Sequence, residues 1–433
     1  MEKLIQKGKE LYFLLVAVLM YYFITEVINL GLFVTFRHAF ALVLFASALL
    51  LFLFRPNIAR GVVAVRSALW YSLPLAVTIF ASLFIWFMGQ VDVSVISRGL
   101  SGAFVYNNML SFALAAGAIL YVFGERGIWY NLMAILCANI LMILTIMMQY
   151  GVGSYFSELV ALITSFAAVT GDIIVQAEVH ELAFCLGAYL IYMLLKPKKN
   201  IAFYILMALT LFCFLSAFKR IGMIAIAVAM AFGWGLRIIG KFRKETAKNL
   251  TVFLSVLLCV ILVGYIAVIK MDVFALLEQI GIDTSGRVDI YHAVDRFYEF
   301  SPEFLGNGIG FLTYQLSSVM HVGVSSVHND FLQYYIDLGF WGYLLWLLSM
   351  TVARVCYFGR KGKIDNAILC LSLSIYLVIV SSTDNTMNYP LLTAVLAVLM
   401  IGDGFDKDVR EQEQKMFSYI SDENKAKQGR KML

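Results

Sequence analysis

Charged residues and prolines are scarce in this chain of 433 residues. Asp, Glu, Lys and Arg make up 14% of it, whereas soluble domains carry about 25% charged residues. The five prolines leave most apolar runs unbroken. Low charge therefore excludes an ordinary soluble domain, and recurring runs of about 20 apolar residues predict a polytopic α-helical membrane protein. A membrane barrel would show alternation in segments of about 10 residues, which we do not find.

Several enzyme motifs are also missing. The sequence has no HExxH, Walker or GxSxG motif and no Cys/His metal spacing. The glycine-rich stretch LGNGIG at 305–310 lacks the preceding strand and the spacing of a nucleotide loop. The six cysteines fall inside apolar runs without a CxxC pair, which favours a packing role. We expect metal-independent chemistry without a cofactor, and no nucleic-acid partner.

Hydropathy predicts an all-α fold of about twelve transmembrane helices. We expect a single transmembrane domain over 1–402 and a charged, partly disordered cytoplasmic tail over 403–433. The helices are predicted at 11–33, 38–54, 67–89, 104–123, 128–150, 181–196, 201–217, 221–239, 250–269, 329–357, 365–382 and 389–402.

The distribution of lysine and arginine predicts the orientation. With both termini in the cytoplasm, all but seven of the 33 cations lie on the cytoplasmic side, as the positive-inside rule requires. The outer side then holds a large loop at 270–327 and a smaller segment at 151–180, whose apolar spacing suits an interfacial helix. All five histidines fall on or near this side: His38, His180, His292, His321 and His328.

The stretch SSVHNDFLQYYID, residues 325–337, begins the predicted helix 329–357 with unusual polarity. Ser325 or Ser326 could cap this helix, and Asp330 suits its first turn. His328 is a candidate acid/base or hydrogen-bonding group, because a histidine pKa suits proton transfer at neutral pH.

Asn329, Gln333 and Asp337 recur every four residues and form one stripe on the same helix. Such a stripe faces protein or water rather than lipid. Two interpretations stay open: a cap with a buried hydrogen-bonded network, or a polar cavity open to the outside. Gly339 and Gly342 would allow close helix packing.

Further cations lie on the predicted outer side. Lys219 and Arg220 occupy a tight turn between two helices, where they either snorkel to head groups or bind an anion. Thr284 or Ser285 could begin an amphipathic helix that carries three more basic residues, namely Arg287, His292 and Arg296. Arg287 is either a solvated loop residue or a ligand of a lipid-linked phosphate.

Taken together, these residues resemble the O-antigen ligase/polymerase superfamily. The match lies at about 284–346, in an arginine-then-aromatic helix, a proline and glycine turn, and an H-N-x-x-L-Q motif followed by two glycines. FKRIG at 218–222 resembles the family's S-R-G, although Lys219 precedes the arginine and Ile221 separates it from Gly222. The region after His180 lacks the asparagine-rich turn associated with ligases, which favours a polymerase.

The resemblance implies a GT-C-like glycosyltransferase on the outer face of the bacterial cytoplasmic membrane. Its donor would be a glycan on undecaprenyl diphosphate. Its acceptor would be another lipid-linked repeat unit, as in a Wzy-type polymerase, or lipid A core, as in a ligase. A chain-length regulator would be a further partner, beside the membrane lipids. His328 would be the base or hydrogen-bonding partner for the acceptor hydroxyl, and Arg220 and Arg287 would stabilise the leaving diphosphate. The residues expected to bind the substrates are Lys219, Asn329, Gln333, Arg296 and His292.

Three other readings remain open. A secondary transporter would place ionisable groups near the middle of the membrane, and a lipid-linked oligosaccharide flippase would need a deep cationic cavity. The predicted helices are nearly free of charge apart from Glu26 and Asp337. A non-catalytic assembly protein would keep its function when His328, Arg220 and Arg287 are replaced by alanine.

Overall fold

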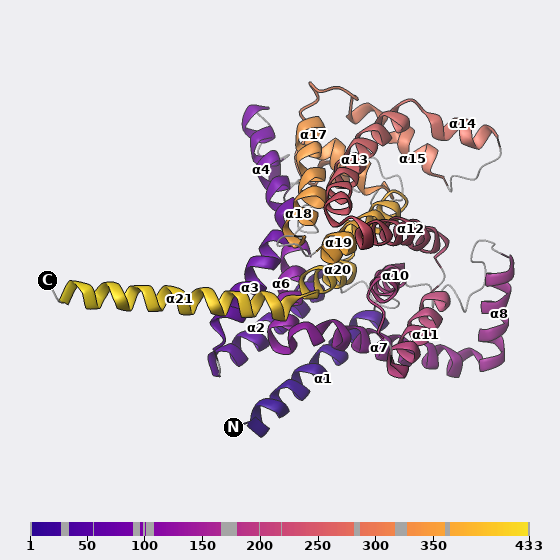
Figure 1. Ribbon diagram of the computed structural model, residues 1–433. Helices are drawn as coiled ribbons and strands as arrows, with labels where there is room; N and C mark the ends of the chain where they lie inside the picture. Colours follow the sequence, from indigo (N-terminus) through magenta and orange to yellow (C-terminus); the bar gives the residue numbers. More distant parts are fainter. Residues whose placement is uncertain are drawn as a thin grey trace. The chain divides into compact units, whose positions relative to one another are not determined.

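The computed structural model describes most of the chain as helices (Figure 1). Every regular element that it describes is helical, which confirms the all-α expectation. The described residues are 2–26, 34–54, 56–89, 96–97, 100, 108–165, 180–198, 200–217, 219–280, 286–316, 327–359 and 364–431.

The chain divides into two compact units. Unit 1 comprises Met1–Trp70, Ser111–Ala177 and Ala394–Leu433, and unit 2 comprises Tyr71–Leu110 and Glu178–Thr393. Unit 1 holds α1 (Glu2–Glu26), α2 (Val34–Phe54), α3 (Ile58–Tyr71), α7 (Gly127–Tyr150), α8 (Val152–Ser165), α21 (Phe405–Lys431) and most of α6 (Asn108–Phe123) and α20 (Pro390–Gly402).

Unit 2 contains the residues that the sequence singles out. Its helices are α4 (Leu73–Met88), α10 (His180–Leu195), α11 (Ile201–Ser216), α12 (Arg220–Phe242), α13 (Lys244–Lys270), α14 (Val273–Gln279), α15 (Arg287–Val294), α16 (Phe311–Tyr314), α17 (Asp330–Leu348), α18 (Arg354–Phe358) and α19 (Ile364–Ser381).

Each of the twelve predicted apolar segments overlaps a helix or helix pair, and parts of the segments 11–33 and 104–123 lie outside the described residues. Within the described residues, five helices are long and apolar enough to cross a membrane, or six if the bent pair α3–α4 forms one span. Four further apolar helices, at Ala41–Phe54, Glu181–Leu195, Ile201–Ser216 and Pro390–Gly402, are shorter. The membrane character is supported, while twelve spans and the orientation stay predictions.

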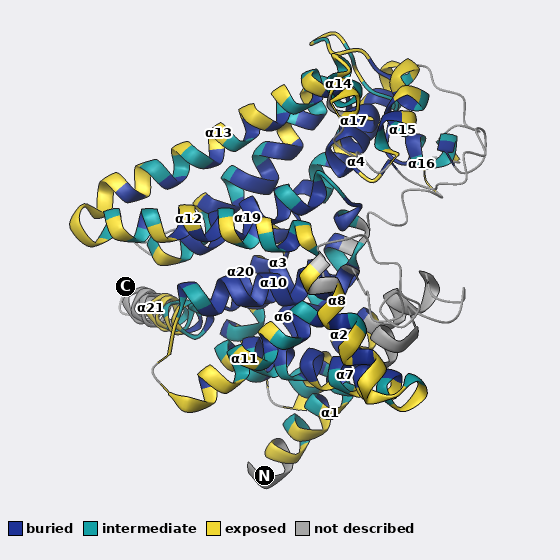
Figure 2. Cartoon of the chain, turned by 90° about the vertical axis from the view of Figure 1, so that its right-hand side faces the viewer, coloured by how far each residue is buried: buried dark blue, intermediate teal, exposed yellow. Residues whose placement is uncertain are grey.

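Unit 2 is built on helices that differ in burial. Figure 2 shows α19 largely buried, whereas α13 carries an exposed apolar stripe along its length. Two contacts show that α12 and α19 run antiparallel. Arg237, near the end of α12, lies 3.6 Å from Asp365 at the start of α19, and Gly233, one turn earlier on α12, approaches Ser372, two turns later on α19. This register places the beginning of α12 level with the residues that follow α19.

The sequence did not indicate two features of the charged residues. Arg354 is buried, and its Nε donates to the Tyr71 carbonyl at 3.0 Å. The helical partner of that carbonyl would be the Leu75 backbone N–H, which instead donates to the Ser72 carbonyl at 3.0 Å. The tail, expected to be partly disordered, forms α21 from Phe405, since its Glu, Gln, Lys and Arg residues favour helix.

Candidate functional site

The beginning of α17 brings His328 and Asn329 to one end of unit 2. Asn329 is the N-cap of α17, and its Oδ1 accepts from the Leu332 backbone N–H at 3.2 Å. The predicted caps Ser325 and Ser326 lie outside the described residues. His328 immediately precedes the cap and has a φ of 51°, a left-handed conformation that few non-glycine residues adopt.

The loop after α19 faces the His328 ring. Asn385 Nδ2 lies 3.3 Å from His328 Nδ1, and Asp384 Oδ1 lies 4.0 Å from the same nitrogen. The His328 side chain is 46% exposed, while the Asp384 side chain is only 11% exposed. The ring is therefore held on its Nδ1 side, which leaves Nε2 as the nitrogen that can meet a substrate.

This loop, residues 381–389 (SSTDNTMNY), is fixed by hydrogen bonds to the first turn of α17. Asp330 Oδ2 accepts from Thr386 Oγ1 at 3.1 Å and from the Met387 backbone N–H at 3.0 Å. The Tyr389 hydroxyl donates to Asp384 Oδ1 at 2.8 Å.

Sequence reasoning missed the 381–389 loop. Its signal is a run of polar residues between two long apolar segments, on the predicted outer side. Nothing in the sequence indicates that Asp384 and Asn385 pack against His328, because the contact joins residues 57 positions apart in the chain.

Arg287 reaches the same loop from α15. Its Nη2 donates to the Thr383 carbonyl at 2.8 Å. α15 begins at Arg287 after Gly286, which has a φ of 72°, while Thr284 and Ser285 lie outside the described residues. One turn later on α15, the Tyr291 hydroxyl accepts from Asn329 Nδ2 at 3.0 Å.

The amide of Asn329 ties three helices together. Its Nδ2 contacts the hydroxyls of Tyr291 on α15 and Tyr265 on α13, each at 3.0 Å. Burial raises the pKa of Tyr291, and the hydrogen bond from Asn329 and the charge of Arg287 oppose that rise. Of the three residues in the polar stripe, only Asn329 therefore lies beside His328 and the residues around it.

The other two members of the stripe, Gln333 and Asp337, instead form hydrogen bonds with the glycine-rich turn 305–310 and with α16, which follows it directly. Gln333 Nε2 donates to Thr313 Oγ1 at 3.1 Å. The two carboxylate oxygens of Asp337 accept from the backbone N–H groups of Gly310 and Leu312, each at 3.0 Å. Gln333 and Asp337 are therefore buried in a hydrogen-bonded network, and among the described residues no contact joins either of them to His328. The predicted role of Gln333 in substrate binding stays a prediction.

The two glycines of α17 also differ. A Cβ on Gly342 would lie 3.2 Å from the Ala81 side chain of α4, in agreement with close helix packing. Gly339 has a φ of 69° inside α17, and its backbone approaches Leu305 and Gly306. The absence of a side chain at Gly339 therefore lets the glycine-rich turn 305–310, rather than another helix, pack against α17.

Lys219 and Arg220 lie at the beginning of α12. Lys219 is the N-cap residue, and Arg220, the first residue of the helix, is exposed. The antiparallel register of α12 and α19 places this end level with the 381–389 loop, and therefore at the same end of unit 2 as His328.

His292 and Arg296 have partners elsewhere on the surface. His292 Nε2 lies 2.9 Å from Asp272 Oδ1, and both side chains are 54% exposed. The guanidinium of Arg296 lies 4.8 Å from the centre of the Phe297 ring. No contact among the described residues connects either side chain to His328, so their predicted role in substrate binding stays a prediction.

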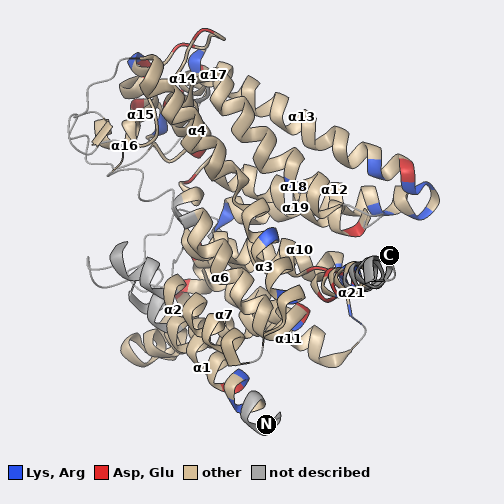
Figure 3. Cartoon of the chain, turned by 90° about the vertical axis from the view of Figure 1, so that its left-hand side faces the viewer, with Lys and Arg blue, Asp and Glu red and all other residues tan. Residues whose placement is uncertain are grey.

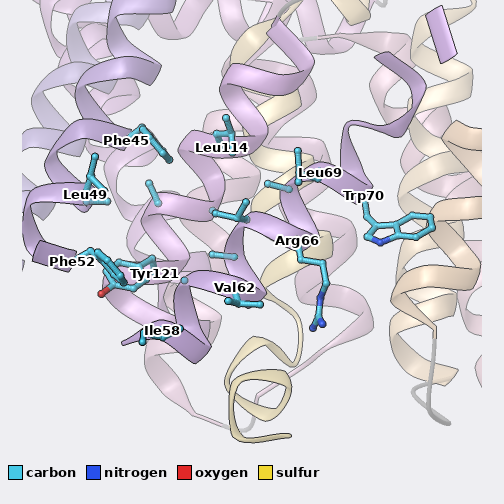
Figure 4. A pocket seen from close by; sticks show the side chains of 17 residues that line it. Phe45, Leu49, Phe52, Ile58, Val62, Arg66, Leu69, Trp70, Leu114 and Tyr121 are labelled. Carbon is cyan, nitrogen blue, oxygen red and sulfur yellow. The ribbon is translucent and has the colours of Figure 1, made fainter. Parts of the chain in front are cut away.

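An apolar groove lies in unit 1, and none of the predicted site residues lines it. α2, α3 and α6 line it with side chains that include Phe45, Leu49, Leu69 and Tyr121, as Figure 4 shows. Such a lining, apolar apart from Arg66 and the hydroxyl of Tyr121, suits lipid chains.

The geometry places an exposed imidazole, a carboxylate and a guanidinium around one loop. This combination can accept a proton from a hydroxyl and stabilise an anion next to it. No curated protein matches the chain. A family model described as "O-Antigen ligase" matches residues 202–347, which include α12, α15 and the start of α17. This match over residues 202–347 confirms the resemblance to the O-antigen ligase/polymerase superfamily.

Proposed function

We propose that the chain polymerises undecaprenyl-diphosphate-linked oligosaccharide repeat units on the outer face of the bacterial cytoplasmic membrane. Surface polysaccharide would be its product. The observation that carries this proposal is the His328 ring, held through Nδ1 by the 381–389 loop and exposed at the end of unit 2. The family match supports glycosyl transfer of this kind.

The chemistry needs a base and cations. The acceptor hydroxyl oxygen bonds to the anomeric carbon of the donor glycan, while the bond from that carbon to the diphosphate oxygen breaks. His328 Nε2 takes the hydroxyl proton, and undecaprenyl diphosphate leaves with the bonding electrons. Arg287, Arg220 and Lys219 would stabilise its charge, so no acid catalyst is needed.

Two proton arrangements of His328 are consistent with its neighbours. If Nδ1–H points to Asp384, Nε2 carries the lone pair and serves as the base. If Nδ1 accepts from Asn385, Nε2–H donates a hydrogen bond to the acceptor oxygen instead. In the first arrangement, the Asp384 carboxylate faces Nδ1–H and would stabilise the ring after Nε2 has taken a proton. A buried carboxylate at this position therefore favours the arrangement in which His328 is a general base.

A ligase is the second candidate, because the matching family model carries that description. It would use the same residues to transfer the lipid-linked glycan to lipid A core. The secondary transporter and the flippase are less well supported, since the His328 cluster lies at one end of unit 2 rather than midway along its helices.

The test is the glycan ladder of cells that carry His328→Asn at the normal protein level. Asparagine tolerates the left-handed backbone but cannot act as a base, so the fold is retained and activity falls by about 100-fold or more. Single repeat units on the acceptor would indicate a polymerase. Long chains that accumulate on the lipid carrier would indicate a ligase. An unchanged ladder would refute a catalytic role of His328.

A further inference from the structure

A charged cavity lies at the end of α12 that is farther from His328. It has a volume of about 660 Å³ and is lined by the end of α12 and the beginnings of α13 and α19. Figure 3 shows basic residues gathered where α12 ends and α13 begins. The side chains and backbone that line it belong to Trp234, Arg237, Ile238, Gly240, Lys241, Lys244, Ile364, Asp365 and Ile368.

The charges of this cavity are unbalanced. Arg237, Lys241 and Lys244 face a single carboxylate, that of Asp365, which lies 3.6 Å from Arg237 Nε. Lys241 and Lys244 are exposed, and within the described part of the chain neither forms an ion pair. The cavity therefore has two cations more than its own carboxylate neutralises.

Two helices begin at this cavity, while α12 ends there, so the partial negative charge at the end of α12 offsets one of the two positive helix N-termini. Lys244 is the first residue of α13, which has 27 residues, and Ile364 is the first residue of α19, which has 18. Both residues line the cavity. The N-terminus of a helix carries unsatisfied N–H groups and a partial positive charge, both of which favour an anion.

Apolar side chains form the remaining wall. Trp234 and Ile238 lie one turn apart on α12 and are 50% and 57% exposed. Tryptophan is enriched where membrane helices meet the head groups, and isoleucine suits the first methylene groups of an acyl chain. A soluble anion would make no use of this wall, whereas a phospholipid would use both parts.

We propose that this cavity binds the phosphate group of an anionic phospholipid, with its acyl chains along Trp234 and Ile238. Lys241 and Lys244 contact the phosphate together with the beginnings of α13 and α19. Arg237 is held by Asp365 and closes one side. This site is independent of the proposed glycosyl transfer, because it lies at the other end of α12.

The test uses the purified full-length protein in detergent, incubated with equal amounts of dioleoylphosphatidylglycerol and dioleoylphosphatidylcholine. The two lipids share their acyl chains and differ in head-group charge. Native mass spectrometry counts the lipids that stay bound. We expect the wild type to retain phosphatidylglycerol, and K241Q/K244Q to lose that preference by about fivefold for each lysine removed.

R243Q/K248Q is the matched control, because it removes the same charge from neighbouring positions that do not line the cavity. Equal loss in this control, or a wild type without preference, would overturn the proposal. Displacement of phosphatidylglycerol by inorganic phosphate, but not by chloride at the same ionic strength, would also overturn it and indicate a soluble anion. Gel filtration checks that both variants fold.

Discussion

The two halves of the polar stripe on α17 have different tasks. At its beginning, Asn329 joins α13 and α15 beside the exposed His328 ring. Two turns further along α17, Asp337 is buried, and its carboxylate accepts hydrogen bonds from the backbone N–H groups of Gly310 and Leu312. Regular spacing places such residues on one helix face, but the segment packed against each position decides whether it stabilises the fold or meets a substrate.

Replacement of Asp337 should have the largest effect on stability. Asp337→Ala leaves the N–H groups of Gly310 and Leu312 buried without this acceptor, at a cost of about 4 kcal/mol. We expect a lower thermal midpoint and little folded protein in the membrane, measured by fluorescence-detected gel filtration after heating. His328→Asn serves as the comparison and should fold normally, because asparagine tolerates the left-handed backbone at this position. Equal midpoints for both variants would mean that the two halves do not differ.

Replacement of Asp384 should reduce activity rather than stability. Asp384→Asn keeps the shape of the 381–389 loop but removes the carboxylate 4.0 Å from His328 Nδ1. The protonated ring loses its nearest negative charge, and we expect the rate of glycan transfer to fall about tenfold, equal to about 1.4 kcal/mol. The measurement is polymer formation by the purified protein from lipid-linked repeat units.

The two proton arrangements of His328 predict different rates for Asp384→Asn. The rate falls about tenfold if the ring is a base. An unchanged rate would show that the ring only donates a hydrogen bond from Nε2. Asn385→Ala is the complementary variant, because it removes the contact at 3.3 Å and keeps the carboxylate. It should affect the rate less than Asp384→Asn if the ring is a base.

Replacement of Arg296 should have the smallest effect. Arg296→Gln removes a cation that is exposed and contacts the Phe297 ring. Exposed side chains of this kind contribute little to stability, and we expect activity to change less than twofold. Arg287→Gln in the same assay should reduce activity strongly, since Arg287 contacts the 381–389 loop. A strong loss for Arg296→Gln would extend the site beyond the end of α15.

Hydropathy and one motif predict much of this arrangement. Long apolar runs place the helices, because a membrane helix must satisfy its backbone internally. The H-N-x-x-L-Q motif identifies His328 and Asn329. The sequence could not assign Asp384, because the packing of α17 against the loop after α19 is a tertiary contact. It also could not separate Asp337 from Asn329, since the same spacing describes both.

The dependence of His328 on the 381–389 loop has a consequence for biosynthesis. Asp384 and Asn385 are made more than 50 residues after His328, and α19 lies between them in the chain. A nascent chain therefore has α17 and its cap well before it has the partners of the imidazole. Any product truncated before Asp384 would carry the recognisable motif and still lack the groups that hold the ring, so the motif alone does not identify a competent enzyme.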